Sequence, residues 1–183
     1  MPTRNTERVQ GRDAFFLTAT QKNHRHRPTD WLRFEGDLRP RAYDTTHLGE
    51  MGPSPWDAFG LLHNAHCKLR TWTMQAAMES LARNADGDEL LFIHRGSGQL
   101  FCDYGHLAVN EGDYIVIPRS TMWRLESDEA MQVLMVEATG GSYMLPDKGM
   151  LGNHAIFDPA ILDVPSIDDA FLAQQDESEW EVQ

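Results

Sequence analysis

Short apolar runs recur at a spacing of about ten residues in the middle of the chain, which is typical of an antiparallel β-sandwich or barrel. The runs cover residues 89–94, 99–102, 106–109 and 114–117. Segments rich in Gly, Asp and Asn separate them at residues 95–98, 103–105 and 110–113. Because these residue types favour tight turns, the pattern predicts four strands joined by short loops.

Further strands are expected on both sides of this region. Alternation predicts strands at 69–74 and 131–137, and shorter ones at 31–34, 41–43 and 78–83. We expect residues 1–60 to form an N-terminal arm with short strands, one of them near 14–17. Residues 61–140 would form the β core and 141–183 an irregular extension, with a short helix whose N-cap is Ser166 and whose capping-box residue is Asp169. The expected core residues are Leu90, Phe92, Leu100, Leu107, Tyr114, Val116, Leu134 and Val136.

Charge and composition narrow the possible partners. The formal net charge is −12 and the sequence pI is near 5.0, so the surface should repel phosphate backbones. We therefore expect neither nucleic acid nor a membrane as a partner. The two cysteines, Cys67 and Cys102, form no CxxC pair, and the N-terminus has no apolar signal region. These features predict a cytoplasmic protein without a disulfide framework.

Several polar residues are candidates for a metal site or for catalysis. His24 and His26 form an H-x-H pair, but the flanking arginines favour a solvated loop. The candidate metal ligands are His63, His66, Glu89, His94 and His106. His94 shares its strand face with Leu90 and Phe92, so we expect it to point towards the interior as a hydrogen-bonded core residue.

The acidic residues before the first central strand have a simpler interpretation than acid–base catalysis. Asp86, Asp88 and Glu89 lie close together around Gly87. An Asp-Gly pair between strands supplies the backbone angles of a turn, and that interpretation is favoured. No residue of the chain is predicted to be catalytic.

The central stretch resembles the cupin superfamily, whose fold is a double-stranded β-helix. Residues 89–96 match the Glu-to-Gly part of the first cupin motif, and residues 112–118 match the G-x5-P part of the second. The family's metal-binding histidines fall on Ala82 and Asn84 (or Arg83 and Ala85) and on Trp123. The resemblance thus implies a jelly-roll-like all-β barrel in which only Glu89 remains of four metal-ligand positions.

Two segments are similar, more specifically, to homogentisate 1,2-dioxygenases. They are the N-A-D-G-D-E run at 84–89 and the L-P-D-K-G-M-L-G-N run at 145–153. In that family, a two-cupin chain opens an aromatic diol ring with O2 at Fe(II), and the iron ligands lie in the C-terminal cupin. The resemblance implies that this chain is the metal-free N-terminal half, followed by a second cupin that residues 141–183 would lead towards.

Three hypotheses follow from the sequence. In the first, the chain is the structural and oligomerising half of such a dioxygenase, with Fe(II) bound in the other half, a small aromatic substrate and a C-terminal cupin or another copy as partner. In the second, it is a stand-alone degenerate cupin that binds a small ligand or dimerises. In the third, it is a metal enzyme that uses the non-standard ligands named above.

Overall fold

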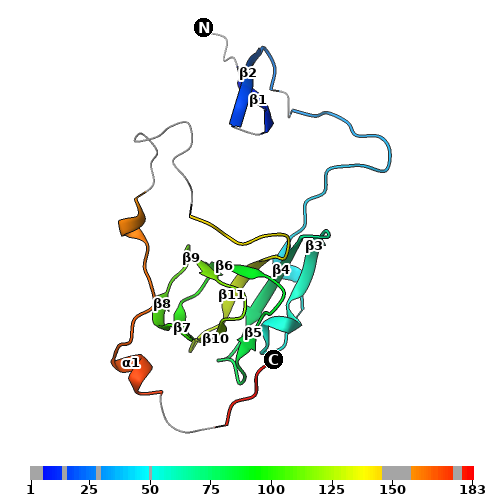
Figure 1. Cartoon of the computed structure of the whole chain (residues 1–183). Coiled ribbons are helices and arrows are strands. Elements are labelled where there is room, and N and C mark those ends of the chain that lie inside the picture. The colour runs from blue at the N-terminus through cyan, green and yellow to red at the C-terminus, as the bar shows by residue number, and fades with distance from the viewer. Residues whose placement is uncertain (1–5, 14–15, 28–29, 50, 146–157, 175–178) are drawn as a thin grey trace. The chain divides into compact units, whose positions relative to one another are not determined.

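The computed structural model describes residues 6–13, 16–27, 30–49, 51–145, 158–174 and 179–183. The chain divides into two compact units: residues 1–44 with 146–157, and residues 45–145 with 158–183. Figure 1 shows the first unit as a hairpin with a long connecting segment and the second as the strand-rich body.

The described residues of the first unit include an antiparallel pair of strands. Strand β1 (Thr6–Asp13) pairs with β2 (Phe16–His24). Sequence patterning predicted a single short strand near 14–17 and missed this longer pairing; residues 14 and 15 lie outside the described part. The strands expected at 31–34 and 41–43 are not present. Both segments are irregular and exposed, and no described strand pairs with them.

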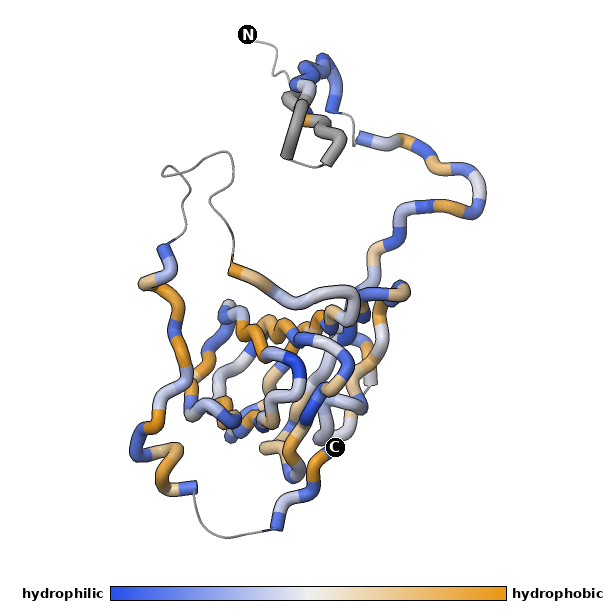
Figure 2. Tube along the Cα trace, in the orientation of Figure 1, coloured by the Kyte–Doolittle hydropathy of each residue, from blue (hydrophilic) through white to orange (hydrophobic). Residues whose placement is uncertain are grey.

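The second unit is built from two antiparallel sheets, which confirms the predicted all-β jelly-roll-like fold. One sheet has the order β5-β10-β7-β8 and the other β3-β4-β11-β6-β9. Figure 2 shows apolar positions recurring along these strands. The bounds in the four-stranded sheet are β5 Ala82–Arg83, β7 Gly98–Cys102, β8 Gly105–Val109 and β10 Met122–Glu126. Those in the five-stranded sheet are β3 Phe59–His63, β4 Cys67–Met74, β6 Asp88–Arg95, β9 Tyr114–Ile117 and β11 Met131–Ala138.

The core lies between the two sheets, and it uses a different strand face from the one that we predicted. The five-stranded sheet directs inward Trp72, Met74, Leu91, Ile93, Ile115, Ile117, Met131, Val133 and Met135. Six predicted core residues point to the opposite face: Leu90, Phe92, Tyr114, Val116, Leu134 and Val136. Of the predicted set, Leu100 is buried in the core, and Leu107 packs against it half-buried.

The C-terminal residues pack against the four-stranded sheet. The Leu81 N–H donates to the carbonyl of Glu181, and the Gln183 N–H donates back to the carbonyl of Leu81, each at 2.9 Å. The guanidinium of Arg124 lies 4.2 Å from the ring centroid of Trp180 and 5.5 Å from that of Phe101. These contacts attach the C-terminal segment to the edge of the barrel.

The extension before this segment contains a short helix that begins later than predicted. The helix α1 spans Asp169–Leu172, and its N-cap is Asp168, whose Oδ1 accepts from the N–H of Phe171 at 2.9 Å. Ser166, the expected N-cap, instead forms a β-bridge with His106. Gly105 permits this bridge, because a Cβ there would lie 2.4 Å from the carbonyl oxygen of Ser166. The described part of the unit also contains the 3-10 helices η1 Thr45–His47, η2 Pro55–Asp57 and η4 Pro159–Ile161.

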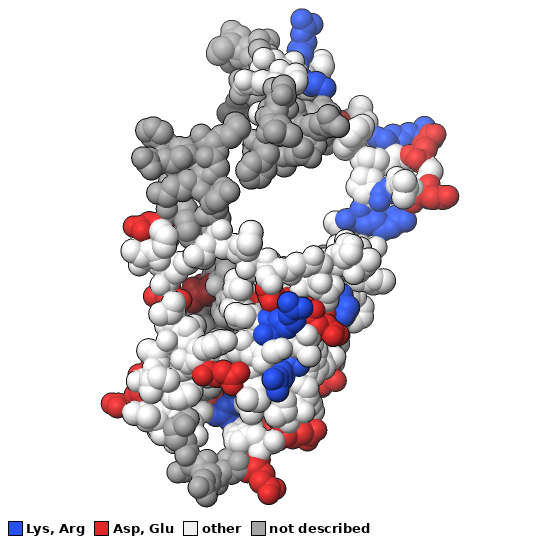
Figure 3. Space-filling model, in the orientation of Figure 1, with Lys and Arg blue, Asp and Glu red and all other residues white. Residues whose placement is uncertain are grey.

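The surface of the second unit carries both signs of charge. Figure 3 shows acidic and basic side chains interspersed on its visible side, with no continuous basic area among the residues drawn in colour. No helix in the described part of the chain is long and apolar enough to cross a membrane.

One carboxylate ties two loops to the five-stranded sheet. Asp88, at the start of β6, accepts from the N–H of Arg119 through Oδ1 and from that of Tyr143 through Oδ2, each at 2.8 Å. Burial alone would raise the pKa of Asp88, but these N–H donors and the charge of Arg119 hold it below its ordinary value. The ionised carboxylate is therefore part of the folded structure.

We expect Asp88→Ala to lower the free energy of unfolding by about 2 kcal/mol at pH 7, because two partly buried N–H groups lose a charged acceptor. The lowered pKa gives the sign of the pH dependence. The wild-type advantage should be complete above pH 3.8 and disappear as the pH falls through the lower folded-state pKa. Urea unfolding between pH 2 and pH 7 measures this. The exposed neighbour Asp86→Ala is the matched control, and an equal loss in both variants would refute the assignment.

Candidate functional site

A group of charged residues lies on the inner face of the five-stranded sheet. Arg70 comes from β4, Glu89 from β6 and Glu137 from β11, which lies between the other two strands. The Arg70, Glu89 and Glu137 side chains are 13%, 1% and 4% exposed. Ionised groups are rarely buried so deeply without partners, so their contacts decide what this interior can do.

The strand register places two carboxylates directly opposite each other. Glu137 is the cross-strand neighbour of Glu89 on one side and of Lys68 on the other. Like charges in directly opposed positions repel. Arg70 offsets this repulsion, because its Nη2 lies 3.2 Å from Glu89 Oε1 and 3.4 Å from Glu137 Oε2. The Nζ of Lys68 lies 3.0 Å from Glu137 Oε1. The cluster therefore contains two carboxylate side chains and two cationic side chains.

Burial dominates the protonation of Glu89. Removal from water raises the pKa of this carboxyl above its ordinary value, and the neighbouring charge of Glu137 raises it further. The positive charge of the Arg70 guanidinium opposes this rise in pKa without cancelling it. Glu89 is therefore an acid whose charged form is disfavoured by its surroundings.

Two tryptophans enclose the charged group. The Arg70 guanidinium carbon lies 5.2 Å from the ring centroid of Trp56, in the loop before β3, and Trp123 of β10 is fully buried. Among the described residues, four buried polar atoms in this region have no hydrogen-bond partner: Arg70 Nε, Glu89 Oε2, Trp56 Nε1 and Trp123 Nε1. Because the indoles offer only N–H donors and Glu89 only one free oxygen, the interior is poor in electron-pair donors.

The sequence matches a known family over most of the chain. The profile of the family described as "Homogentisate 1,2-dioxygenase N-terminal" matches residues 60–182. This chain belongs to that family. The homogentisate 1,2-dioxygenase of Sinorhizobium fredii is 31% identical over 85 residues, which is 45% of this chain and 19% of the relative. That of Caenorhabditis elegans is 26% identical over 98 residues, or 53% of this chain and 22% of the relative.

The matched segments thus span about a fifth of the length of these homogentisate dioxygenases. Similar solved structures include cupin domains. A cupin-2 protein from Shewanella frigidimarina has a TM-score of 0.41 and 16% identity, covering 45% of this chain and 80% of its own. The Cnp3 cupin domain of Schizosaccharomyces pombe has a TM-score of 0.47 and 10% identity, covering 74% and 86%.

The positions at which a cupin would hold its metal do not fit iron in this member of the homogentisate dioxygenase N-terminal family. An open Fe(II) site requires about three strong ligands, usually two imidazoles and a carboxylate. Here Ala82 offers no donor, and Trp123, its cross-strand partner, offers only an N–H. The Oδ1 of Asn84 accepts from the N–H groups of Asp86 and Gly87 at 2.9 and 3.1 Å. Glu89, the one remaining ligand type, is paired with Arg70.

The other candidate ligands are not brought together with Glu89. His94 shares a strand face with Phe92 as expected, but this face points outward and not into the core. His63 is exposed at the end of β3, and the backbone carbonyl of exposed His66 accepts from the N–H of Thr139 at 2.9 Å. Nδ1 of His106 lies 2.8 Å from Asp168 Oδ2. Within the described ranges, no three His, Cys, Asp or Glu side chains form a group able to hold a metal.

Sequence reasoning identified Glu89 but missed its partners. Arg70 and Lys68 precede Trp72 and Met74 at a period of two, which places all four on the core face of β4. A cation on a core face implies a buried acid nearby, and this signal was present in the sequence. The identity of that acid depends on the pairing of β11 with both β4 and β6, which the sequence alone does not give.

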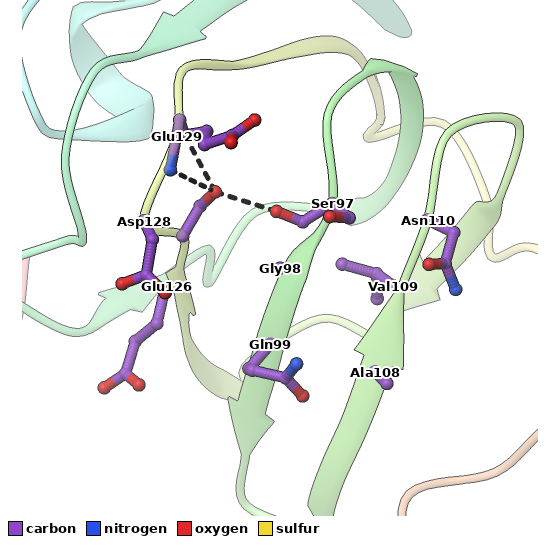
Figure 4. A pocket seen from close by; sticks show the side chains of 10 residues that line it. Ser97, Gly98, Gln99, Ala108, Val109, Asn110, Glu126, Asp128 and Glu129 are labelled. Atoms are coloured by element: carbon purple, nitrogen blue, oxygen red, sulfur yellow. Dashed lines mark hydrogen bonds between the residues drawn. The ribbon is translucent and has the colours of Figure 1, made fainter.

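A shallow acidic hollow lies on the surface, away from the interior cluster. It opens between the β7–β8 hairpin and the turn before β11, and Glu126, Asp128, Glu129, Gln99 and Asn110 lie around it (Figure 4). Ser127 Oγ donates to the carbonyl of Ser97, which ties the two turns together at 2.7 Å. Its lining residues include no Lys, Arg or His that could activate Ser127 or balance the three carboxylates, so this hollow has no evident chemistry.

We expect Arg70→Met to lower the free energy of unfolding by about 3 kcal/mol or more, since it leaves two opposed carboxylates buried without their shared cation. Chemical denaturation of the variant at pH 7 measures the loss. Arg83→Met is the control, because the side chain of Arg83 is exposed and its Nε donates to the carbonyl of Ser120 and not to a carboxylate. Combining Arg70→Met with Glu89→Gln should restore part of the stability. A full-size loss that Glu89→Gln leaves unchanged would contradict the assigned pairing.

The raised pKa of Glu89 predicts a pH-dependent difference between the wild type and Glu89→Gln. At low pH both side chains are neutral, and the two proteins should have similar stability. As the pH rises through the raised folded-state pKa, the wild type must bury a charge, and its stability should fall relative to the Gln variant. Parallel unfolding curves at pH 4 and pH 8 test the sign. A wild-type advantage that grows with pH would show that Arg70 outweighs burial.

Proposed function

We propose that this chain is the structural, oligomerising N-terminal cupin of a homogentisate 1,2-dioxygenase-like enzyme. The observation that carries the proposal is the pairing of Glu89 with Arg70 at the only cupin ligand position that still holds a suitable residue type. A carboxylate that neutralises a buried guanidinium is a poor iron ligand, because binding a metal would leave the guanidinium unpaired. The family membership supplies the reaction class.

In this proposal the chemistry occurs in a C-terminal cupin beyond the 183 residues. That domain would hold Fe(II) and the small aromatic substrate, and the barrel described above would support it or build the assembly. The cross-strand ion cluster supports the structural role, since it ties β4, β11 and β6 together through side chains as well as through the backbone. A cytoplasmic location belongs to the same proposal.

A stand-alone role as a dimerisation module is the second candidate. It is favoured by the apolar residues on the outward face of the five-stranded sheet, among them Tyr114 and Val116. The two proposals share the absence of catalysis in this chain. They differ in whether the natural gene product also carries an iron-binding cupin.

Oxygen uptake with homogentisate and Fe(II) tests the division of labour. We expect no activity above the protein-free rate from the 183-residue chain, and less than about 0.1 equivalent of retained iron after gel filtration, because the cupin positions lack imidazoles. The longest natural product of the gene should consume oxygen and retain iron. Glu89→Gln in that product should leave turnover unchanged. Activity in the short chain would refute the proposal.

A further inference from the structure

The outer face of the five-stranded sheet, which is the face opposite the core, carries two cross-strand rows in which nine of ten positions are apolar or aromatic. The first row runs across all five strands through Leu62, Leu69, Val136, Leu90 and Val116. Residues directly opposite on neighbouring antiparallel strands project to the same side, so these five side chains form a continuous band.

The second row runs parallel to the first. It consists of Phe59, Thr71, Leu134, Phe92 and Tyr114. The rings of Phe92 and Tyr114 lie 4.6 Å apart between centroids, so the aromatic part of the row is already packed. Four of five positions are apolar or aromatic, whereas a sheet face that meets water usually alternates in the opposite sense, with polar residues outward.

The exposed part of this face is large enough for a specific contact. Leu62 and Tyr114 are each 68% exposed, and Phe59 and Val116 are each 49% exposed. The exposed apolar area of these residues and of the half-buried members of the two rows is about 600 Å². The largest apolar patch on a typical monomer has about 300–600 Å². Two such faces packed together would bury about 1,200 Å², the lower limit for specific protein–protein interfaces.

The charge distribution on this face favours another copy of the same chain. The sequence carries 28 acidic residues and a net charge of −12, so most pairs of surfaces would repel. The outward positions of these five strands hold a single acidic residue, Asp88. Its carboxylate is buried and accepts from the N–H groups of Arg119 and Tyr143. A twofold contact brings each patch onto its own copy, and this face can do so without opposing like charges.

We propose that the outer face of the five-stranded sheet is the interface between two copies of this chain, packed face to face around a twofold axis. The proposal deepens the structural role proposed above and rests on it for its biological purpose. Aligned sheet packing places such faces about 10 Å apart, with side chains of the two layers interdigitating. The central strand β11 supplies Leu134 and Val136 to the middle of the contact.

Sedimentation of the full 183-residue chain tests the proposal. The wild type should be a dimer at micromolar concentration. Tyr114→Glu on β9 and Leu62→Glu on β3, at opposite edges of the sheet, should each raise the dimer dissociation constant about 30-fold or more, because each buries a carboxylate in an apolar contact. Tyr104→Glu is the matched control, since Tyr104 is 58% exposed in the β7–β8 turn, away from this face.

Circular dichroism spectra and thermal unfolding separate loss of folding from loss of association. Both variants should fold, because Leu62 and Tyr114 lie on edge strands and their side chains are exposed in the single chain. A wild type that stays monomeric to about 100 µM overturns the proposal. That result is also expected if the face receives a different domain or a segment of the same chain. A dimer that survives both substitutions overturns this interface but leaves the structural role intact. The oxygen-uptake experiment decides that role independently.

Discussion

The interior of the barrel depends on one guanidinium placed between two carboxylates that the sheet forces together. Glu89 and Glu137 are direct neighbours because β6 and β11 pair in a single register, and their repulsion would oppose that register. Arg70, on the other side of β11, contacts both and removes the conflict. A buried cluster of this kind adds little net stability compared with apolar residues, but removal of its shared cation is costly because both carboxylates then stay buried without it. The cluster therefore makes the three strands depend on one another.

This cluster also explains why the sequence predicted the strands well and their orientation poorly. The runs at 89–94, 114–117 and 131–137 all became strands, with ends shifted by a residue or so. Within them, apolar residues occupy both alternating sets, as in Leu90, Leu91, Phe92 and Ile93. Glu89 and Glu137 belong to the set that faces the core. A rule that places charges outward therefore selects the wrong set, and only the pairing with Arg70 reverses it.

The sequence alone predicted that metal ligands are missing from the candidate site, but it did not predict how the remaining side chains are arranged. Spacing alone identified Glu89 as the remaining cupin ligand and placed Ala82, Asn84 and Trp123 where imidazoles would be needed. Arg70 is 19 residues from Glu89 and joins it only through the pairing of both strands with β11. The hairpin of β1 and β2 was missed for a different reason. Its strands are rich in polar residues, so an alternation of apolar and polar positions is absent there.

The ion cluster and the outer face are two consequences of one arrangement. The charges at inward positions on β4, β6 and β11 do not contact the solvent on the outer side of the sheet, and the outward positions of the same strands include Leu69, Leu90, Phe92, Leu134 and Val136. This sheet buries an ion cluster on its inner face and exposes apolar residues on its outer face. Such an outer face is poorly suited to contact with water. The sheet is well suited to a middle layer, whose inner charges fix the register of the strands and whose outer side chains bury themselves against a partner. An inner face without metal ligands and an outer face that packs against a partner are therefore compatible in one barrel.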